Sequence, residues 1–462
     1  MRHHDLIVVG TGSGNSIPDE RFADLDIAII DDGTFGGTCI NVGCIPTKMF
    51  VHTADLAAAA RGSSRLGVDS HVDKVRWTDI RDRIFGRIDP ISVAGRRYRQ
   101  DGHGTTFYDE PVRFVGPRTL RLASGDDLTA DRIVLAAGSR AMVPAVPGLE
   151  TIRDRVHTSD TIMRIDSLPE SIVILGGGVI AAEMAWDLCL SRPAVSAEAA
   201  GTGIRLHLLA ALGQPDPVPA EGDLLLVATG RVPNSDRLEV EAGGVTTHAD
   251  GRIVVDEFQR TTADGVYALG DISSPDQLKH VANHEARIVQ HNLLHPRDLI
   301  EADHRYVPHA VFSSPQVAGV GKTEDELEAS DTPYVAATQA YGDVAYGWAM
   351  EDTTGFVKVL ADPATGLLLG AHLIGPQAFQ RHPADHHGDE LRASRARDGP
   401  WTALDPPRHA RGRGERPSPA ASRLTTPTAG GRTMQTCPRP IPTSPSMTGM
   451  SSTAVTGRAV SS

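Results

Sequence analysis

The sequence contains no run of about 18 apolar residues, so it offers no candidate for a transmembrane helix. Its first apolar stretch, Leu6 to Val9, is too short for the apolar region of a signal peptide and lacks a small-residue cleavage site. We therefore predict a cytoplasmic protein with no membrane partner.

Basic residues are also in the minority. The chain holds 45 Lys and Arg against 58 Asp and Glu, which gives a net charge of −13 and an isoelectric point of about 5.8. This balance argues against a nucleic-acid partner. The chain has 462 residues, of which 40% are hydrophobic and 22% charged, as expected for a globular protein of several domains.

Cysteine is scarce, and its placement excludes a secreted disulfide framework. There are four cysteines, and only Cys39 and Cys44 lie close together. A zinc site would need two more ligands, and no nearby Cys or His pair supplies them, so we predict no metal. An inert buried pair stays open as an alternative. A redox disulfide fits best, because the spacing places both sulfurs within reach across about one helical turn and a helix N-terminus would lower a thiol pKa.

A glycine-rich turn, residues 10–15, follows an apolar strand predicted at residues 5–10. Such glycines allow backbone N–H groups to approach a pyrophosphate at a helix N-terminus. Asp31 ends a second predicted strand at residues 26–31, where a carboxylate can accept hydrogen bonds from a ribose. A plain structural turn is the alternative, but the strand before it and the acid after it favour a dinucleotide site.

A second turn of this kind, Gly176 to Ala181, has the spacing Gly-x-Gly-x-x-Ala and follows an apolar strand at residues 172–175. Two such turns suggest two nucleotide cofactors, although one of them could be a packing turn. A further strand at residues 266–270 ends in Gly270-Asp271, which can bring a carboxylate to a ribitol hydroxyl.

The rest of the chain predicts an α/β protein followed by an antiparallel α+β region at residues 305–375. Helices are predicted at residues 16–23, 48–62 and 280–294, and further strands at residues 131–137, 204–209 and 223–229.

The chain changes character after Gln380. Residues 381–462 hold 11 of the 31 prolines, 12 arginines, no lysine and only six Leu, Ile or Val. Such a segment cannot bury enough apolar surface to offset its ordering entropy, so we predict disorder. Its composition also suggests an out-of-frame reading of GC-rich DNA.

These motifs, in this order, resemble those of the flavin-dependent pyridine nucleotide-disulphide oxidoreductases. The resemblance covers about residues 5–380 and is most specific at residues 36–48, Gly-Gly-Thr-Cys-Ile-Asn-Val-Gly-Cys-Ile-Pro-Thr-Lys. Several stretches look most like the mycothione reductase subfamily, in which Asn15 stands where relatives usually carry Gly. These stretches are residues 10–16, 74–77, 85–90 and 341–352.

The resemblance implies two Rossmann-like dinucleotide-binding domains, one for FAD and a shortened one for NADPH, and a truncated α+β interface domain. The implied boundaries are an FAD domain at 1–150, an NAD(P)H domain at 151–235, a central FAD segment at 236–302, a dimerisation domain at 303–380 and the tail at 381–462.

The resemblance also assigns roles to particular residues. Cys44 would lie against the flavin, and Cys39 would be the thiol that attacks the substrate. Lys48 would sit near the flavin N5 and pair with Glu183. The residues assigned to FAD are Gly10, Gly12, Gly14, Asp31, Gly37, Thr38, Lys48, Gly138 and Asp271, and those assigned to NADPH are Gly176, Gly178, Ala181 and Gly230.

The implied reaction passes electrons from NADPH through FAD and the Cys39–Cys44 disulfide to a small-molecule disulfide, most closely mycothione. A dihydrolipoamide dehydrogenase-like acceptor stays open. Mercuric ion would call for a C-terminal cysteine pair, whereas Cys437 stands alone.

Two departures from the family bear on activity. Only 54 residues separate Gly176 from Gly230, so the NADPH domain is short and its choice between NADPH and NADH is open. The family's C-terminal His-Pro followed closely by Glu is also missing, because His382-Pro383 comes too early and Glu390 lies eight residues on. We therefore expect a weakened homodimer, and a catalytically impaired flavoprotein remnant is the alternative function.

Overall fold

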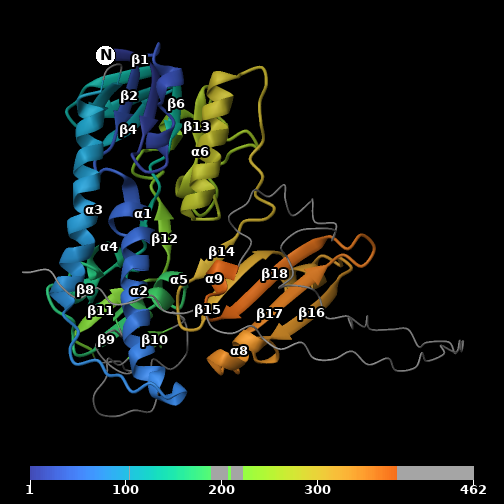
Figure 1. Cartoon of the computed structure of the whole chain (residues 1–462). Helices are drawn as coiled ribbons and strands as arrows, with labels where there is room; N and C mark the ends of the chain where they lie inside the picture. The colour runs from blue at the N-terminus through green and yellow to red at the C-terminus, as the bar shows by residue number, and fades with distance from the viewer. Residues whose placement is uncertain (103–104, 189–205, 210–221, 382–462) are drawn as a thin grey trace, which may run out of the picture. The chain divides into compact units, whose positions relative to one another are not determined.

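The computed structural model describes residues 1–102, 105–188, 206–209 and 222–381, all within the first of two units, Met1–Arg411 (Figure 1). The predicted disordered tail lies outside the described residues from 382 onward. Much of the segment predicted to be a shortened NADPH domain, residues 189–205 and 210–221, lies outside them as well.

The first sheet is a parallel sheet with an antiparallel extension, in the order β3-β2-β1-β6-β5-β4, and β13 also pairs with β6. Its strands are β1 (Arg2–Val9), β2 (Ile27–Ile30), β3 (Thr105–Tyr108), β4 (Val112–Gly116), β5 (Thr119–Leu122), β6 (Asp127–Leu135) and β13 (Val266–Ala268). Leu6, Ile7 and Val8 of the central β1 are completely buried, as expected for a parallel strand covered on both faces.

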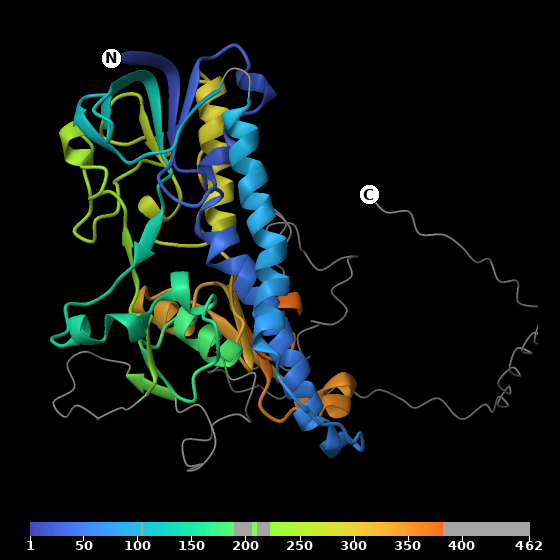
Figure 2. The ribbon, with the colours of Figure 1, turned by 90° about the vertical axis from the view of Figure 1, so that its left-hand side faces the viewer.

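The two faces of this sheet pack against different partners. On one face, Leu6 and Val8 join a core with Val289 of α6 (Lys279–Leu294). On the other face, Ile7 and Val9 pack with the β4–β5 hairpin. The long helix α3 (Trp77–Gln100) contacts both β3 and α2 (Cys44–Gly62), and Figure 2 shows it in light blue alongside the darker blue α2.

The second sheet is parallel, in the order β10-β9-β11-β8. Its elements are β8 (Val156–His157), α4 (Ser159–Ile162), β9 (Ile172–Leu175), α5 (Val179–Leu188), β10 (Leu206–Leu209) and β11 (Leu224–Val227). Ile172 and Ile174 of β9 share a core with Phe50 of α2, so α2 joins the first dinucleotide region to the second. An antiparallel pair, β7 (Ser139–Ala141) with β12 (Arg231–Pro233), carries the chain out of the first region and back.

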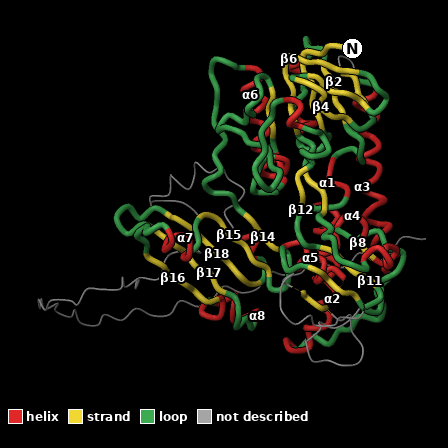
Figure 3. The backbone as a smooth tube through the Cα atoms, turned by 180° about the vertical axis from the view of Figure 1, so that it is seen from behind, coloured by secondary structure: helices red, strands yellow, loops and turns green. Residues whose placement is uncertain are grey.

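The third sheet is antiparallel, in the order β14-β15-β18-β17-β16, and Figure 3 shows its strands in yellow side by side. Its elements are β14 (His309–Val311), β15 (Gln316–Gly321), α7 (Glu324–Ala329), β16 (Val335–Ala340), α8 (Ala345–Met350), β17 (Phe356–Ala361), β18 (Leu368–Gly375) and α9 (Ala378–Arg381). The α/β fold with an antiparallel final region is therefore confirmed.

The local predictions fare unevenly. The predicted strands are all present, and the predicted helix at 280–294 is α6. The helix predicted at residues 16–23 is wrong: only 3-10 turns occur there, at Gly14–Ser16 and Glu20–Phe22. The Asp19 carboxylate accepts from the Arg21 backbone N–H, and such local side-chain bonds compete with helix formation. Among the described helices, none has the length and apolar character needed to cross a membrane.

Candidate active site

A cavity of about 950 Å³ lies at the carboxyl edge of the first sheet. Its wall begins where the strands end: at Gly10 after β1, at Asp31 after β2, at Ala136 after β6 and at Leu269 after β13. Ligands of open α/β sheets bind at this edge, and the volume is near the upper end of the range for small-molecule sites, about 300–1,000 Å³. The cavity is therefore large enough for an extended cofactor.

The cavity brings together most of the residues singled out in the sequence. Those in its wall are Gly10, Gly12, Asp31, Gly37, Thr38, Cys39, Cys44, Lys48, Gly138, Glu183 and Asp271. Five others are not among the lining residues, namely Gly14, Gly176, Gly178, Ala181 and Gly230. The functional roles of both sets stay predictions, but only the first set lies in the wall of this cavity.

The glycine-rich turn allows two stretches of backbone to come very close together. Gly10 has φ +106°, and a Cβ there would lie 2.3 Å from the Ala136 carbonyl oxygen. Gly37 has φ +72°, and its Cβ would lie 2.8 Å from the Cα of Gly12. Only glycine avoids these clashes, and the bare backbone leaves N–H groups open to a phosphate. The residues present thus fit a dinucleotide cofactor.

Gly14 lies close to the end of β6. A Cβ at this position would lie 2.7 Å from the side chain of Ala136, which directly follows β6, so the missing side chain permits this close approach. Gly176 repeats the arrangement of Gly10 after β9, with φ +124° and a Cβ position 2.2 Å from the Ala228 carbonyl oxygen. The second turn therefore has the same tight geometry as the first.

Asp31 shapes the first turn. One carboxylate oxygen accepts from the backbone N–H of Thr11 at 2.6 Å and from its hydroxyl at 2.5 Å, and the other accepts from the Gly33 N–H at 2.7 Å. A carboxylate has about four lone-pair sites, so one acceptor position is left for a ligand hydroxyl.

The two thiols belong to two different helices. Cys39 lies on α1 (Gly37–Asn41), and Cys44 is the first residue of α2. The expectation that the two thiols span one turn of one helix is wrong, because the helical backbone is interrupted before α2 begins at Cys44. A Cβ at Gly43 would lie 3.0 Å from the Thr38 carbonyl oxygen, so glycine permits the break. Both cysteines are free thiols in this structure, with Cys44 exposed in the cavity wall.

The environment of the pair lowers the pKa of one thiol and raises that of the other. The Cys39 thiol donates a hydrogen bond to Cys44, and together with the nearby Lys48 and Lys279 charges this lowers the pKa of Cys44 to about 7. The same hydrogen bond, assisted by burial, raises the pKa of Cys39 above its ordinary range. The pair therefore loses its first proton to leave a thiolate on Cys44.

Lys48 and Glu183 form an ion pair in the cavity wall. The Lys48 Nζ donates to both carboxylate oxygens, at 2.8 and 2.7 Å, and lies 4.1 Å above the centre of the Phe312 ring. Glu183 also accepts from the Phe312 backbone N–H at 3.0 Å, and only 7% of its side chain is exposed. This buried carboxylate is thus fully paired, as its stability requires.

Models of known families match almost the whole described chain. The model described as pyridine nucleotide-disulphide oxidoreductase matches residues 4–200 and 193–286, and that of its dimerisation domain matches residues 307–382. The chain belongs to the pyridine nucleotide-disulphide oxidoreductase family. Membership makes it a disulfide oxidoreductase of the class that uses FAD and NADPH.

Individual relatives agree with this assignment. The chain is 48% identical to mycothione reductase of Mycobacterium tuberculosis over 425 residues, covering 82% of this chain and 91% of that protein. It is 29% identical to dihydrolipoyl dehydrogenase of Halobacterium salinarum, covering 81% and 88%. Its fold resembles that of the HOCl-induced flavoprotein disulfide reductase RclA from Escherichia coli, with a TM-score of 0.69 at 24% identity, covering 81% and 91%.

Two cavity residues of this family member were missed in the sequence. Lys279 begins α6, and its Nζ donates to the Ser13 hydroxyl of the first turn at 2.8 Å. Arg231 donates to the Ser139 hydroxyl at 2.7 Å, and that hydroxyl donates to Asp271, also at 2.7 Å. Lys279 carried no local signal, whereas Arg231 directly follows Gly230 of a segment already singled out.

Within the described residues, no histidine lines the cavity. No group of three or more His, Cys, Asp or Glu with metal-binding geometry is found among them either. His382 and Glu390, which were compared above with the family's His-Pro and Glu motif, lie outside the described residues.

Proposed function

We propose that this protein reduces mycothione to mycothiol with electrons from NADPH, by way of FAD and the Cys39/Cys44 pair. The observation that carries the proposal is the position of both thiols in the wall of the dinucleotide cavity, beside Lys48 and Lys279. The choice of mycothione rests on the 48% identity to mycothione reductase.

The cavity has the groups that an FAD molecule needs. We propose that Gly10, Gly12 and Gly37 admit its phosphates, and that Asp31 and Asp271 accept hydrogen bonds from its sugar hydroxyls. Thr38 and Gly138 complete the wall. We propose NADPH for the second turn, where Gly176 has the same backbone geometry as Gly10 and where Gly178, Ala181 and Gly230 were predicted to contribute.

When bound, FAD supplies the two electrons, taken from NADPH, that open the Cys39–Cys44 disulfide. The Cys39 thiolate then attacks one sulfur of the substrate, forming a mixed disulfide and releasing the first thiol with a proton. The Cys44 thiolate attacks the sulfur of Cys39, which restores the internal disulfide and releases the second thiol. The substrate is thus reduced by two electrons while the pair is oxidised.

The two thiols are suited to these separate tasks. Because the pKa of Cys44 is about 7, its thiol is ionised in about half of the protein molecules near neutral pH. This thiolate can act without a base. Cys39 has a raised pKa, so its attack requires a proton acceptor. Lys48, held by Glu183, places a positive charge beside the Cys44 thiolate.

The dimerisation-domain match supports a homodimer, which we propose as the working form. The structure provides a specific reason to keep an impaired flavoprotein as the second candidate. Cys39 needs a base, yet the described lining of the cavity includes no histidine.

Anaerobic titration of the purified protein with NADPH, followed by addition of mycothione, tests the proposal. We expect the bound flavin to be reduced and then reoxidised when mycothione is added. In Cys39→Ser, NADPH should still reduce the flavin, but mycothione should not reoxidise it. Flavin reduction without mycothione turnover in the wild type would contradict the substrate assignment, and lipoamide serves as the competing acceptor. Absence of flavin reduction would favour the impaired form.

A further inference from the structure

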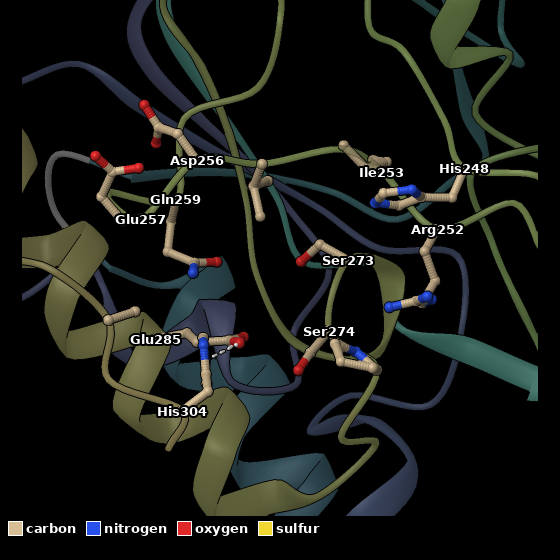
Figure 4. A pocket seen from close by; sticks show the side chains of 13 residues that line it. His248, Arg252, Ile253, Asp256, Glu257, Gln259, Ser273, Ser274, Glu285 and His304 are labelled. Carbon is tan, nitrogen blue, oxygen red and sulfur yellow. Dashed lines mark hydrogen bonds and ion pairs between the residues drawn. The ribbon is translucent and has the colours of Figure 1, made fainter. Parts of the chain in front are cut away.

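A second, smaller cavity of about 340 Å³ lies against α6 and the chain that follows Asp271. Figure 4 shows Glu285 and His304 in its wall, joined by a dashed line, with Ser273 and Ser274 nearby. None of these four residues lines the larger cavity that contains Cys39 and Cys44.

Glu285 is a buried carboxylate with two strong partners. Glu285 as a whole is 1% exposed to solvent. One oxygen accepts from the Gly270 backbone N–H at 2.6 Å, and the other lies 2.9 Å from Nε2 of His304. A buried carboxylate is stable only when such partners compensate for its lost hydration. Removal of either partner leaves one carboxylate oxygen buried without a hydrogen bond.

The Gly270 bond connects this carboxylate to the larger cavity. Gly270 has φ +73°, a left-handed conformation that favours glycine, and it directly precedes Asp271. Asp271 lines the larger cavity and accepts from the Ser139 hydroxyl at 2.7 Å. Glu285 therefore holds the backbone turn that presents Asp271.

We propose that His304 and Glu285 form a positioning pair for the flavin cofactor: protonated His304 holds the Glu285 carboxylate in place, Glu285 holds the Gly270–Asp271 turn, and FAD affinity falls when His304 loses its proton. This inference rests on the proposed FAD site, because Asp271 is assigned to FAD there.

The charges around His304 support this coupling. Its hydrogen bond to Glu285 raises the pKa of His304 above the ordinary value, against the opposing effect of burial, and the negative charges of Asp276 and Asp303 act in the same direction. His284 faces it edge-on, with ring centres 6.3 Å apart, and burial lowers the pKa of His284. The other charged or titratable groups that line this cavity are His248, Arg252, Asp256 and Glu257.

The direction of the pH effect follows from the charge-assisted hydrogen bond, which needs His304 to be protonated. The contribution of the pair is fully present below the ordinary histidine pKa, about 6.5, and is lost as the pH rises through the higher value in the folded protein. His304 can respond to the solvent because 33% of its side chain is exposed, whereas the Glu285 side chain is 1% exposed.

The test is the dissociation constant of FAD from the apoprotein, measured from about one pH unit below to about two units above 6.5. We expect the wild-type constant to rise about tenfold over this range, the difference between a charge-assisted and a neutral hydrogen bond. His304→Gln should bind more weakly with no such pH dependence. His304→Lys keeps a cation and should retain tight binding throughout.

His291→Gln is the matched control. His291 lies on α6, the helix that carries Glu285, but its Nε2 is 2.8 Å from the Asp298 carbonyl oxygen rather than from a carboxylate. This variant should show the wild-type constant and pH profile. Glu285→Gln should weaken FAD binding at every pH. If it fails to fold, the two substitutions at the partly exposed His304 decide the question.

The outcomes separate this inference from the function proposed above. A wild-type pH profile in folded His304→Gln overturns the positioning pair, and so does FAD binding by the wild type that does not vary with pH. An apoprotein that binds no FAD at any pH would instead contradict the proposed cofactor site itself.

Discussion

Replacing Cys39 by alanine should raise the pKa of Cys44 substantially. The largest cause of the lowered Cys44 pKa, about 7, is the hydrogen bond donated by Cys39, while burial acts in the opposite direction. Without that donor, burial remains and only Lys48, Lys279 and the helix N-terminus oppose it. We therefore expect the pKa of Cys44 to return to about 8.5, the ordinary value of a cysteine thiol.

The magnitude determines the assay. At pH 7, a change from about 7 to about 8.5 reduces the thiolate fraction from about one half to about 3%. A thiolate of higher pKa is intrinsically more nucleophilic, so the alkylation rate at one pH falls only about threefold. The midpoint of a pH series is therefore the quantity to measure, by following iodoacetamide labelling of the Cys44 peptide in the reduced protein by mass spectrometry.

Cys39→Ser is the matched variant, since its hydroxyl can still donate to Cys44, and its midpoint should fall between those of the wild type and Cys39→Ala. Lys279→Met should cause a smaller upward shift, because the Lys279 charge contributes less to the lowered pKa of Cys44 than Cys39 and Lys48 do. A midpoint that stays near 7 in Cys39→Ala would refute the reasoning and assign the low pKa to the lysines and the helix.

Three further predictions concern binding and stability. Asp187 is 2% exposed, neither of its carboxylate oxygens has a hydrogen-bond partner among the described residues, and burial followed by the charge of Glu183 raises its pKa well above the ordinary value. Asp187→Leu should therefore stabilise the protein by about 1–3 kcal/mol at pH 7, and thermal melts should show the gain shrinking as the pH falls towards 4, since the acid then becomes neutral in both states. Gly10→Ala should eliminate FAD binding, because its Cβ would meet a carbonyl oxygen at 2.3 Å. Gly86→Ala should retain FAD through purification like the wild type, because a Cβ there would meet no described atom within 4 Å outside its own helix. Lys48→Met should lower the free energy of unfolding in urea by about 1–3 kcal/mol, because it leaves the Glu183 carboxylate buried without its cation, and Glu183→Gln in the same chain should restore part of the loss. Equal stability of Lys48→Met and the wild type would contradict this.

Local sequence patterns predicted the fold well where they reflect burial. The apolar runs of β1, β2, β9 and β13 could be recognised because strands covered on both faces must be apolar throughout. The prediction of a helix at residues 16–23 was wrong because the apolar pattern does not predict the hydrogen bond of the Asp19 side chain. That side chain caps a short 3-10 turn. The short elements β7 and β12 were not anticipated, since three residues carry too little periodicity.

The residues of the candidate site also fall into those that the sequence predicted and those that it did not. Cys39, Cys44 and Gly10 were found because their spacing is short and the backbone demands are specific. Lys279 and Glu285 were not, because their contacts join residues far apart in the chain, and nothing in the neighbouring sequence marks them.

The sequence by itself determined the family, the thiol pair and the glycine turns, because each depends on residues that are neighbours along the chain. Only the tertiary structure showed that Cys39 donates to Cys44 and that Lys279, from the distant helix α6, adds its charge to lower the pKa of Cys44. It alone also showed that Glu285 holds the turn before Asp271. Hydrogen bonds and charges act over a few ångströms in space, and the chain distance between their partners does not predict them.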